Sequence, residues 1–203
     1  MFTQDDGVQP LDTAAALPGE RRTGKRHSIV LLIGRVCRDL HESICLVHDI
    51  SRFGLMARFT VLPSVGERLR IEVRGLPPIQ GTVRWVNGFK AGFEFDEAQD
   101  VDHVFRLRHD DGMIARSPRF PVNASARLRF EDNPFSAEVL DISPGGAKLM
   151  SETPVDQGQT GQIMLTDTGT SIYGTVCWVR DDRFGFRFVA PLPLTTLSQI
   201  LGC

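Results

Sequence analysis

Residues 81–95 read GTVRWVNGFKAGFEF, and residues 174–188 read GTVCWVRDDRFGFRF, so the two stretches align without a gap. In both copies apolar side chains alternate with polar ones, and Gly, Asn or Asp residues interrupt the alternation midway. A period of two over short runs that such residues break is typical of antiparallel strands. The pattern therefore predicts a pair of antiparallel strands that occurs twice in the chain.

The duplication extends upstream of these strands. Residues 47–54 (VHDISRFG) and 139–146 (VLDISPGG) share the motif Asp-Ile-Ser-x-x-Gly, and residues 25–30 (KRHSIV) resemble residues 118–123 (PRFPVN). The interval from the motif's aspartate to the tryptophan is 36 residues in the first copy and 37 in the second. We therefore expect a duplicated module of about 80 residues, which is enough chain to bury a core of its own.

The expected fold class is all-β with short helices, in the form of two six-stranded antiparallel barrels in tandem. About six short strands per module favour a barrel, because closure removes exposed sheet edges. Residues 1–19 contain three acids and no base, and we expect them to form a flexible acidic tail. The first barrel is assigned to residues 20–97, a connecting helix to residues 98–114, and the second barrel to residues 115–203, with a terminal helix over residues 194–201.

Composition excludes several classes of protein. The chain has 203 residues, of which 41% are hydrophobic and 24% charged, and its formal net charge is −2. No apolar run is long enough to cross a bilayer and the N-terminus lacks a secretory pattern, so a cytoplasmic location without membrane insertion is expected. Nucleic-acid-binding domains are usually strongly basic, and this chain is not. The first module is the more basic, with 13 lysines and arginines against 9 acids over residues 20–97, so an anionic partner is expected there.

Cysteines and histidines indicate neither a metal site nor disulfides. The five histidines are scattered without metal-ligand spacing. The cysteines form no Cys-x-x-Cys pair and suit a reducing compartment; they are Cys37, Cys45, Cys177 and Cys203. Since there is also no phosphate-binding glycine loop and no motif that places a nucleophile beside a base, we expect no enzyme, no catalytic residue, no metal and no cofactor.

A basic loop opens the first module. Arg22 and Arg26 form the pattern Arg-x-x-x-Arg, with Arg21 and Lys25 interleaved. Guanidinium groups grip phosphate through two hydrogen bonds and also stack on planar rings. A solvated basic loop is the ordinary alternative.

The Asp-Ile-Ser-x-x-Gly motif supplies complementary chemistry. The Asp49 carboxylate can accept hydrogen bonds from the amino group of a purine, and Ser51 offers a donor and an acceptor. Gly54 allows close backbone approach or a positive φ. The alternative is a turn that ends a strand, in which both side chains bond to the local backbone.

In this order and at this interval, the two motifs resemble those of the PilZ domain, the bacterial receptor module for cyclic di-GMP. The runs Gly-x-Val-x-Trp-Val and Gly-Phe-x-Phe are similar to the same family, and the resemblance covers residues 20–111 and 115–201. It implies a six-stranded barrel with a trailing helix, in which the arginine loop and the Asp-x-Ser-x-x-Gly strand close around the dinucleotide.

The resemblance also implies roles for single residues. Arg22 and Arg26 would contact phosphates and the guanine faces, Asp49 and Ser51 would read a guanine, and Gly54 would leave room for it. Auxiliary contacts are expected from three further cations: Arg21, Lys25 and Arg52. The two tryptophans are expected to lie in the core, because a lone aromatic in an alternating strand usually serves packing; they are Trp85 and Trp178.

The second module departs from the pattern at its arginines. It reads Arg116-x-x-Arg119, with Ala115 where the first arginine of the pair should stand. Its second motif is intact, with Asp141, Ser143 and Gly146. Loss of one charge-assisted phosphate contact removes about 1.5–3 kcal/mol. We therefore expect the second barrel to bind the ligand weakly or not at all and to contact the first barrel or another protein.

The leading hypothesis is a non-enzymatic bacterial protein that binds cyclic di-GMP in its first barrel. Binding would order the basic loop, whose cations repel one another, and change the contact between the modules or with a protein partner. The family implies motility, adhesion, biofilm or exopolysaccharide control as the output. The alternatives are a ligand-independent adaptor of pilus or flagellar machinery, and a single-stranded nucleic-acid binder, which needs exposed stacking aromatics in a basic groove.

Overall fold

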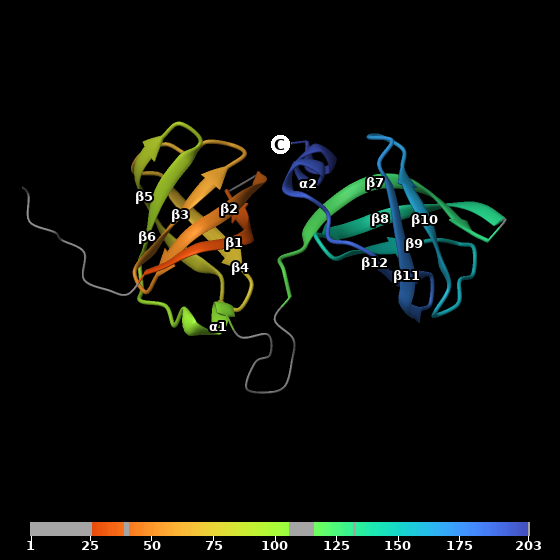
Figure 1. Cartoon of the computed structure of the whole chain (residues 1–203). Helices are drawn as coiled ribbons and strands as arrows, with labels where there is room; N and C mark the ends of the chain where they lie inside the picture. Colours follow the sequence, from red (N-terminus) through yellow and green to blue (C-terminus); the bar gives the residue numbers. More distant parts are fainter. Residues whose placement is uncertain (1–25, 39–40, 106–115, 132, 203) are drawn as a thin grey trace, which may run out of the picture.

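The computed structural model describes residues 26–38, 41–105, 116–131 and 133–202, with side chains from residue 31 onward. The described strands form two closed antiparallel barrels (Figure 1). Their strand orders are β1-β2-β3-β6-β5-β4 and β7-β8-β9-β12-β11-β10, which is the same topology twice. The predicted tandem of two six-stranded barrels is confirmed.

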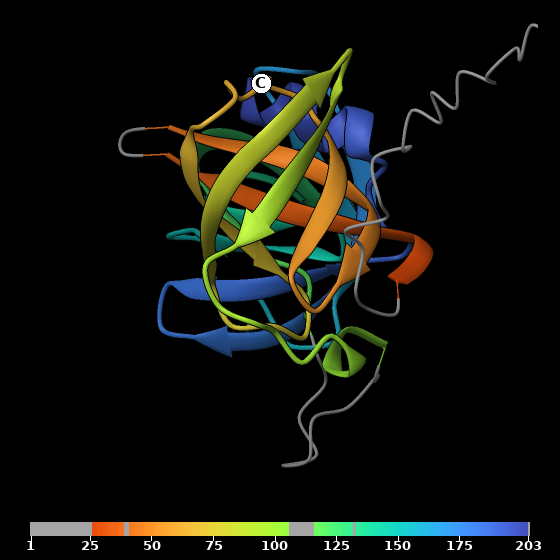
Figure 2. The ribbon, with the colours of Figure 1, turned by 90° about the vertical axis from the view of Figure 1, so that its left-hand side faces the viewer.

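The strands of the first barrel wrap obliquely around its core (Figure 2). Their bounds are β1 (Arg26–Cys37), β2 (Glu42–Ser51), β3 (Gly54–Phe59), β4 (Arg68–Val73), β5 (Ile79–Asn87) and β6 (Lys90–Phe95). The second barrel consists of β7 (Phe120–Phe130), β8 (Asn133–Ser143), β9 (Gly146–Met150), β10 (Thr160–Leu165), β11 (Ser171–Arg180) and β12 (Arg183–Phe188).

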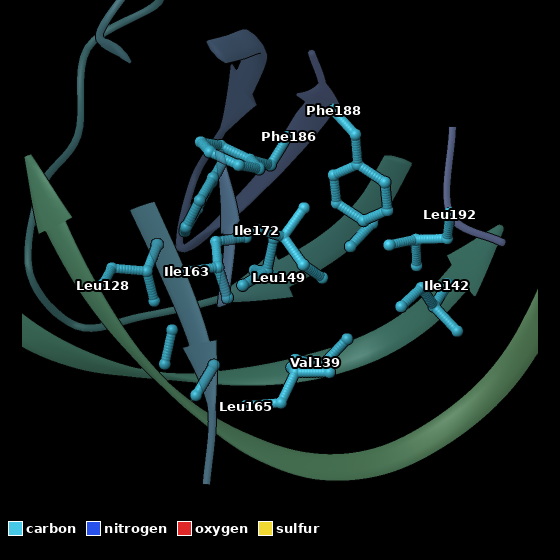
Figure 3. Close-up of a cluster of buried hydrophobic side chains, with 14 of the residues drawn as sticks. Leu128, Val139, Ile142, Leu149, Ile163, Leu165, Ile172, Phe186, Phe188 and Leu192 are labelled. Carbon is cyan, nitrogen blue, oxygen red and sulfur yellow. The ribbon is translucent and has the colours of Figure 1, made fainter. Parts of the chain in front are cut away.

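Each barrel buries an apolar core of its own. Along β4, the inward side chains Leu69, Ile71 and Val73 are buried, as the alternation in the sequence predicts. The alternating residues Arg68 and Arg70 are exposed. The second core is filled mainly by aliphatic side chains around the rings of Phe186 and Phe188 (Figure 3).

Two short helices complete the fold. A connecting helix is predicted over residues 98–114; the structure describes residues 98–105 of this range, and only α1 (Asp102–Phe105) is helical. Val104 from α1 is buried in the first core. Gly75 allows α1 to pack this closely against the barrel, because a Cβ at Gly75 would lie 2.5 Å from the carbonyl oxygen of His103. The helix α2 (Leu194–Leu201) has the predicted bounds and ends at Gly202, whose φ of 67° suits glycine.

The helix α2 also joins the barrels. It lies between them (Figure 1) and contacts β2 of the first barrel. Ile44 of β2 points outward from its own barrel, yet it is fully buried because it packs with the second barrel's cluster, which includes Leu197 of α2. Among the described residues, no helix is both long and apolar enough to cross a membrane.

Candidate ligand site

The second barrel carries a pocket of about 430 Å³ on its outer face. Three arginines line it, from the segment before β7 and from β12, and no carboxylate does so among the described residues. The lining set also contains the serine and glycine of the second Asp-Ile-Ser-x-x-Gly motif. In full, it is Arg116, Ser117, Arg119, Ser143, Gly145, Gly146, Ala147, Cys177, Trp178, Gly185, Phe186 and Arg187.

The structure brings together the two motifs that the sequence places 22 residues apart, because β7 and β8 are paired. The Arg119 guanidinium donates a hydrogen bond to Asp141 Oδ1 and forms an ion pair with it. A register shift between Val139 and Asp141 marks a bulge just before the aspartate. Such a bulge re-aims the side chains that follow it, here toward the arginine segment.

The motif's serine and glycine stabilise the hairpin between β8 and β9, and the equivalent hairpin between β2 and β3. The Ser143 hydroxyl donates to the Gly146 carbonyl at 3.0 Å, and Ser51 does the same to Gly54 at 3.1 Å in the first barrel. The hydroxyl proton is thus used within the turn, and the oxygen lone pairs remain as acceptors. A Cβ on Gly146 would lie 2.7 Å from the carbonyl oxygen of Phe186, so the close approach of β9 to β12 requires glycine.

The tryptophans correct an expectation from the sequence. The sequence predicts that Trp85 and Trp178 lie in the core, but their exposed fractions are 43% and 36%. The register of β5 and of β11 shifts at the residue before the tryptophan, so two successive side chains point outward. Strict alternation would place each tryptophan inside. Instead, the Trp178 indole forms part of the pocket wall.

The first barrel presents the corresponding outer face in part. Asp49, Ser51 and Gly54 lie at the end of β2 and the start of β3, as their counterparts do on β8 and β9. The exposed Arg52 places its guanidinium 5.7 Å from the ring centroid of Phe53. Arg26 begins β1 and its backbone is in register with Ser51. The remaining predicted cations lie outside the described residues; they are Arg21, Arg22 and Lys25.

A salt bridge distinguishes the two outer faces. In the first barrel Arg84 Nε donates to Glu94 Oε2 at 2.7 Å, and this hydrogen bond raises the pKa of the Arg84 guanidinium. In the second barrel, Cys177 occupies the position that corresponds to Arg84 of the first barrel. The Cys177 thiol lies 3.2 Å from the carbonyl oxygen of Gly185. Arg187 stands at the position of Glu94 and lines the pocket. The alignment of the two repeats shows that Cys177 replaces Arg84 and that Arg187 replaces Glu94. Only the strand pairing shows that these residues lie near the Asp-Ile-Ser-x-x-Gly hairpin.

Comparisons with known proteins give a family match for the second half of the chain and similarities to solved structures. Residues 114–203 match the family model described as PilZ domain. Among solved structures, the chain is similar to the Borreliella burgdorferi PlzA protein in complex with c-di-GMP, with 14% identity, 89% of this chain and 93% of that chain covered, and a TM-score of 0.38. It is also similar to Escherichia coli YcgR in complex with c-di-GMP, with 13% identity, coverage of 84% and 80%, and a TM-score of 0.32. No curated protein matches the chain.

Proposed function

We propose that this chain, a tandem of two barrels of which the second is a PilZ domain, is a receptor for cyclic di-GMP. The observation that carries the proposal is the pocket of the second barrel, which is lined by both the family's Asp-x-Ser-x-x-Gly hairpin and an arginine segment. Such a site offers guanidinium forks to phosphates and an indole face to a flat base.

The first barrel supports the proposal through its sequence. It repeats the topology of the PilZ domain and carries the complete pair Arg22 and Arg26 upstream of Asp49. A ligand with two phosphates complements such a pair, and its guanines complement the carboxylate and the stacking faces of the arginines. We therefore assign the principal ligand site to the first barrel, with Ser51 and Gly54 shaping the hairpin beside the base.

The receptor's output would be mechanical and would use the contact between the barrels. The helix α2 follows β12 closely in the chain, β12 lines the pocket, and α2 contacts β2, the strand that ends in the first motif. A ligand that shifts either hairpin would therefore act on the same interface. Motility, adhesion, biofilm or exopolysaccharide control through a protein partner is the corresponding cellular role.

The proposal is tested by measuring the affinity of the full chain for cyclic di-GMP. Arg22→Ala, Arg26→Ala and Asp49→Ala should each weaken binding at the first barrel by tenfold or more, about the effect of one lost charge-assisted contact. Arg58→Ala is the matched control, because Arg58 is an exposed arginine of the same barrel whose guanidinium lies over the ring of Phe89. Wild-type affinity in all three site variants would refute the assignment.

A further inference from the structure

The residue that faces the motif glycine differs in charge between the two barrels. On β6 and β3, Glu94 is in register with Gly54; on β12 and β9, Arg187 is in register with Gly146. A Cβ on either glycine would lie 3.5 Å from the Cα of that facing residue, so the two positions are equivalent in geometry. The first barrel therefore presents a carboxylate at this point and the second presents a guanidinium.

The local partners differ in the same sense. The Glu94 carboxylate is held by Arg84 on the neighbouring strand, at 2.7 Å. In the second barrel the residue equivalent to Arg84 is Cys177, which has no carboxylate to pair with Arg187. Within the described part of the chain, no ion pair joins Arg187 to another residue. The exposed Arg187 guanidinium is thus available to an anion from outside the barrel.

The arginine segment of the second barrel departs from the pattern Arg-x-x-x-Arg in its sequence. Ala115 stands where the first arginine of the Arg-x-x-x-Arg pair is expected. Arg119, the second member, is already paired with Asp141. Arg187 lines the same pocket as Arg116 and Arg119, and it approaches from β12, on the side of the motif glycine.

We propose that Arg187 supplies the phosphate-binding guanidinium that the arginine segment of the second barrel lacks at Ala115, so that this barrel forms a second cyclic di-GMP site. The inference rests on the function proposed above and differs from the sequence-based expectation of weak or no binding there. The Trp178 indole in the same pocket offers a base the stacking face that a phosphate contact alone does not. The exchange of Arg84 for Cys177 removes the group that would otherwise crowd and repel Arg187.

The test isolates the second barrel by titrating cyclic di-GMP into the full chain that carries Arg22→Ala and Arg26→Ala. In this background Arg187→Ala should weaken binding roughly tenfold to a hundredfold, the range for a lost charge-assisted contact. Arg187→Lys should recover part of the loss, since it restores the charge but not the planar fork. Arg183→Ala is the matched control, because Arg183 is an exposed arginine of the same strand outside the pocket, and it should leave the affinity unchanged.

A chemical readout accompanies the titration. Cys177 is exposed and lines the pocket, so ligand in the second barrel should slow its alkylation by a maleimide, and Arg187→Ala should abolish that protection at the same ligand concentration. Thermal melting of each variant verifies the fold.

The outcomes separate this inference from the proposed function. An affinity that Arg187→Ala leaves unchanged in the background of Arg22→Ala and Arg26→Ala would overturn the role of Arg187 and leave the receptor function intact. Absence of both binding and Cys177 protection in the double-arginine background would overturn the second site, while wild-type binding would still report the first. A wild-type chain that binds no cyclic di-GMP would refute the receptor function itself.

Discussion

Each exposed tryptophan lies against a glycine on the neighbouring strand. A Cβ on Gly185 would lie 1.9 Å from Trp178 Nε1, and a Cβ on Gly92 would lie 2.0 Å from Trp85 Nε1. No side chain can occupy the space that the indole fills, so the glycine determines where the ring rests. In the second barrel this fixes a flat aromatic side chain at the edge of the pocket.

Gly185→Ala should therefore displace the Trp178 indole from the barrel surface. In a Trp85→Phe background Trp178 is the only tryptophan, and its fluorescence emission should shift to the red as the ring becomes more solvated. Gly145→Ala is the control, because a Cβ there meets nothing within 4 Å and should leave the emission unchanged. An emission spectrum that Gly185→Ala leaves unshifted would contradict the packing of the Trp178 indole against Gly185.

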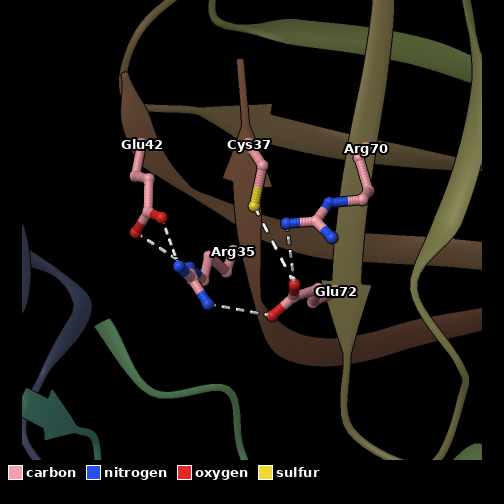
Figure 4. Close-up of polar contacts among 5 residues, drawn as sticks. All are labelled: Arg35, Cys37, Glu42, Arg70 and Glu72. Atoms are coloured by element: carbon pink, nitrogen blue, oxygen red, sulfur yellow. Dashed lines mark hydrogen bonds and ion pairs between the residues drawn. The ribbon is translucent and has the colours of Figure 1, made fainter. Parts of the chain in front are cut away.

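At the scale of the strand, β1 and β2 carry opposite chemistry on their two faces. Outside, Arg35 of β1 donates to Glu42 of β2 at 2.8 Å and to Glu72 of β4 at 3.2 Å, which ties three strands together (Figure 4). Inside, the thiol of Cys45 is fully buried and lies against Gly34, where a Cβ would be 2.8 Å from the sulfur. Burial raises the pKa of Cys45 to about 12.

This raised pKa predicts a pH dependence of stability. An unfolded cysteine titrates near pH 9. Between about pH 9 and about pH 12 the unfolded chain therefore holds fewer protons at Cys45 than the folded chain, and the stability present below pH 9 is lost as pH rises. The free energy of unfolding of the wild type should fall relative to that of Cys45→Ala by about 1.4 kcal/mol per pH unit above 9.

Denaturant titrations of both proteins at pH 8, 9.5 and 10.5 measure this effect. Taking the difference between them cancels the other groups that titrate in the same range. A difference in unfolding free energy that stays constant with pH would contradict the buried thiol.

At the scale of the whole molecule, the barrels are held by an apolar contact rather than by the chain alone. Ile44 lies between Ser43 and Cys45 on β2 and would be an exposed outward residue in an isolated barrel. It is fully buried because it packs with the second barrel's cluster, together with the partly buried Ile33 of β1. Burial of one isoleucine side chain contributes about 1.5–3 kcal/mol.

Ile44→Glu should weaken this contact, because a carboxylate would have to leave water without a partner. Small-angle X-ray scattering of the full chain should then give a larger radius of gyration, as the barrels separate. Leu62→Glu is the control, since Leu62 is already 45% exposed, and its scattering should match that of the wild type. A radius of gyration that is unchanged by Ile44→Glu would show that the barrels are held in some other way.

The sequence predicts the parts of this molecule that depend on local periodicity and repetition. Alternation predicts the strands and the duplication predicts two barrels of equal topology, as observed. The sequence pattern does not predict the bulges, which reverse the inside-outside pattern at Trp85 and Trp178. Nor does it predict the burial of Ile44, which depends on a helix about 150 residues later in the chain. The place of Arg187 beside the motif glycine likewise follows from strand pairing, which local pattern does not specify.

Calorimetric titration of cyclic di-GMP into the wild-type full chain decides whether the protein is a receptor, since it reports affinity and stoichiometry together. A cyclic di-GMP receptor should give saturable heat with cyclic di-GMP and none with GMP, which lacks the second phosphate and the second base. The heat should fall when Arg26→Ala and Arg187→Ala are combined. Folded protein that releases no heat with cyclic di-GMP, or equal heat with GMP, would contradict the account.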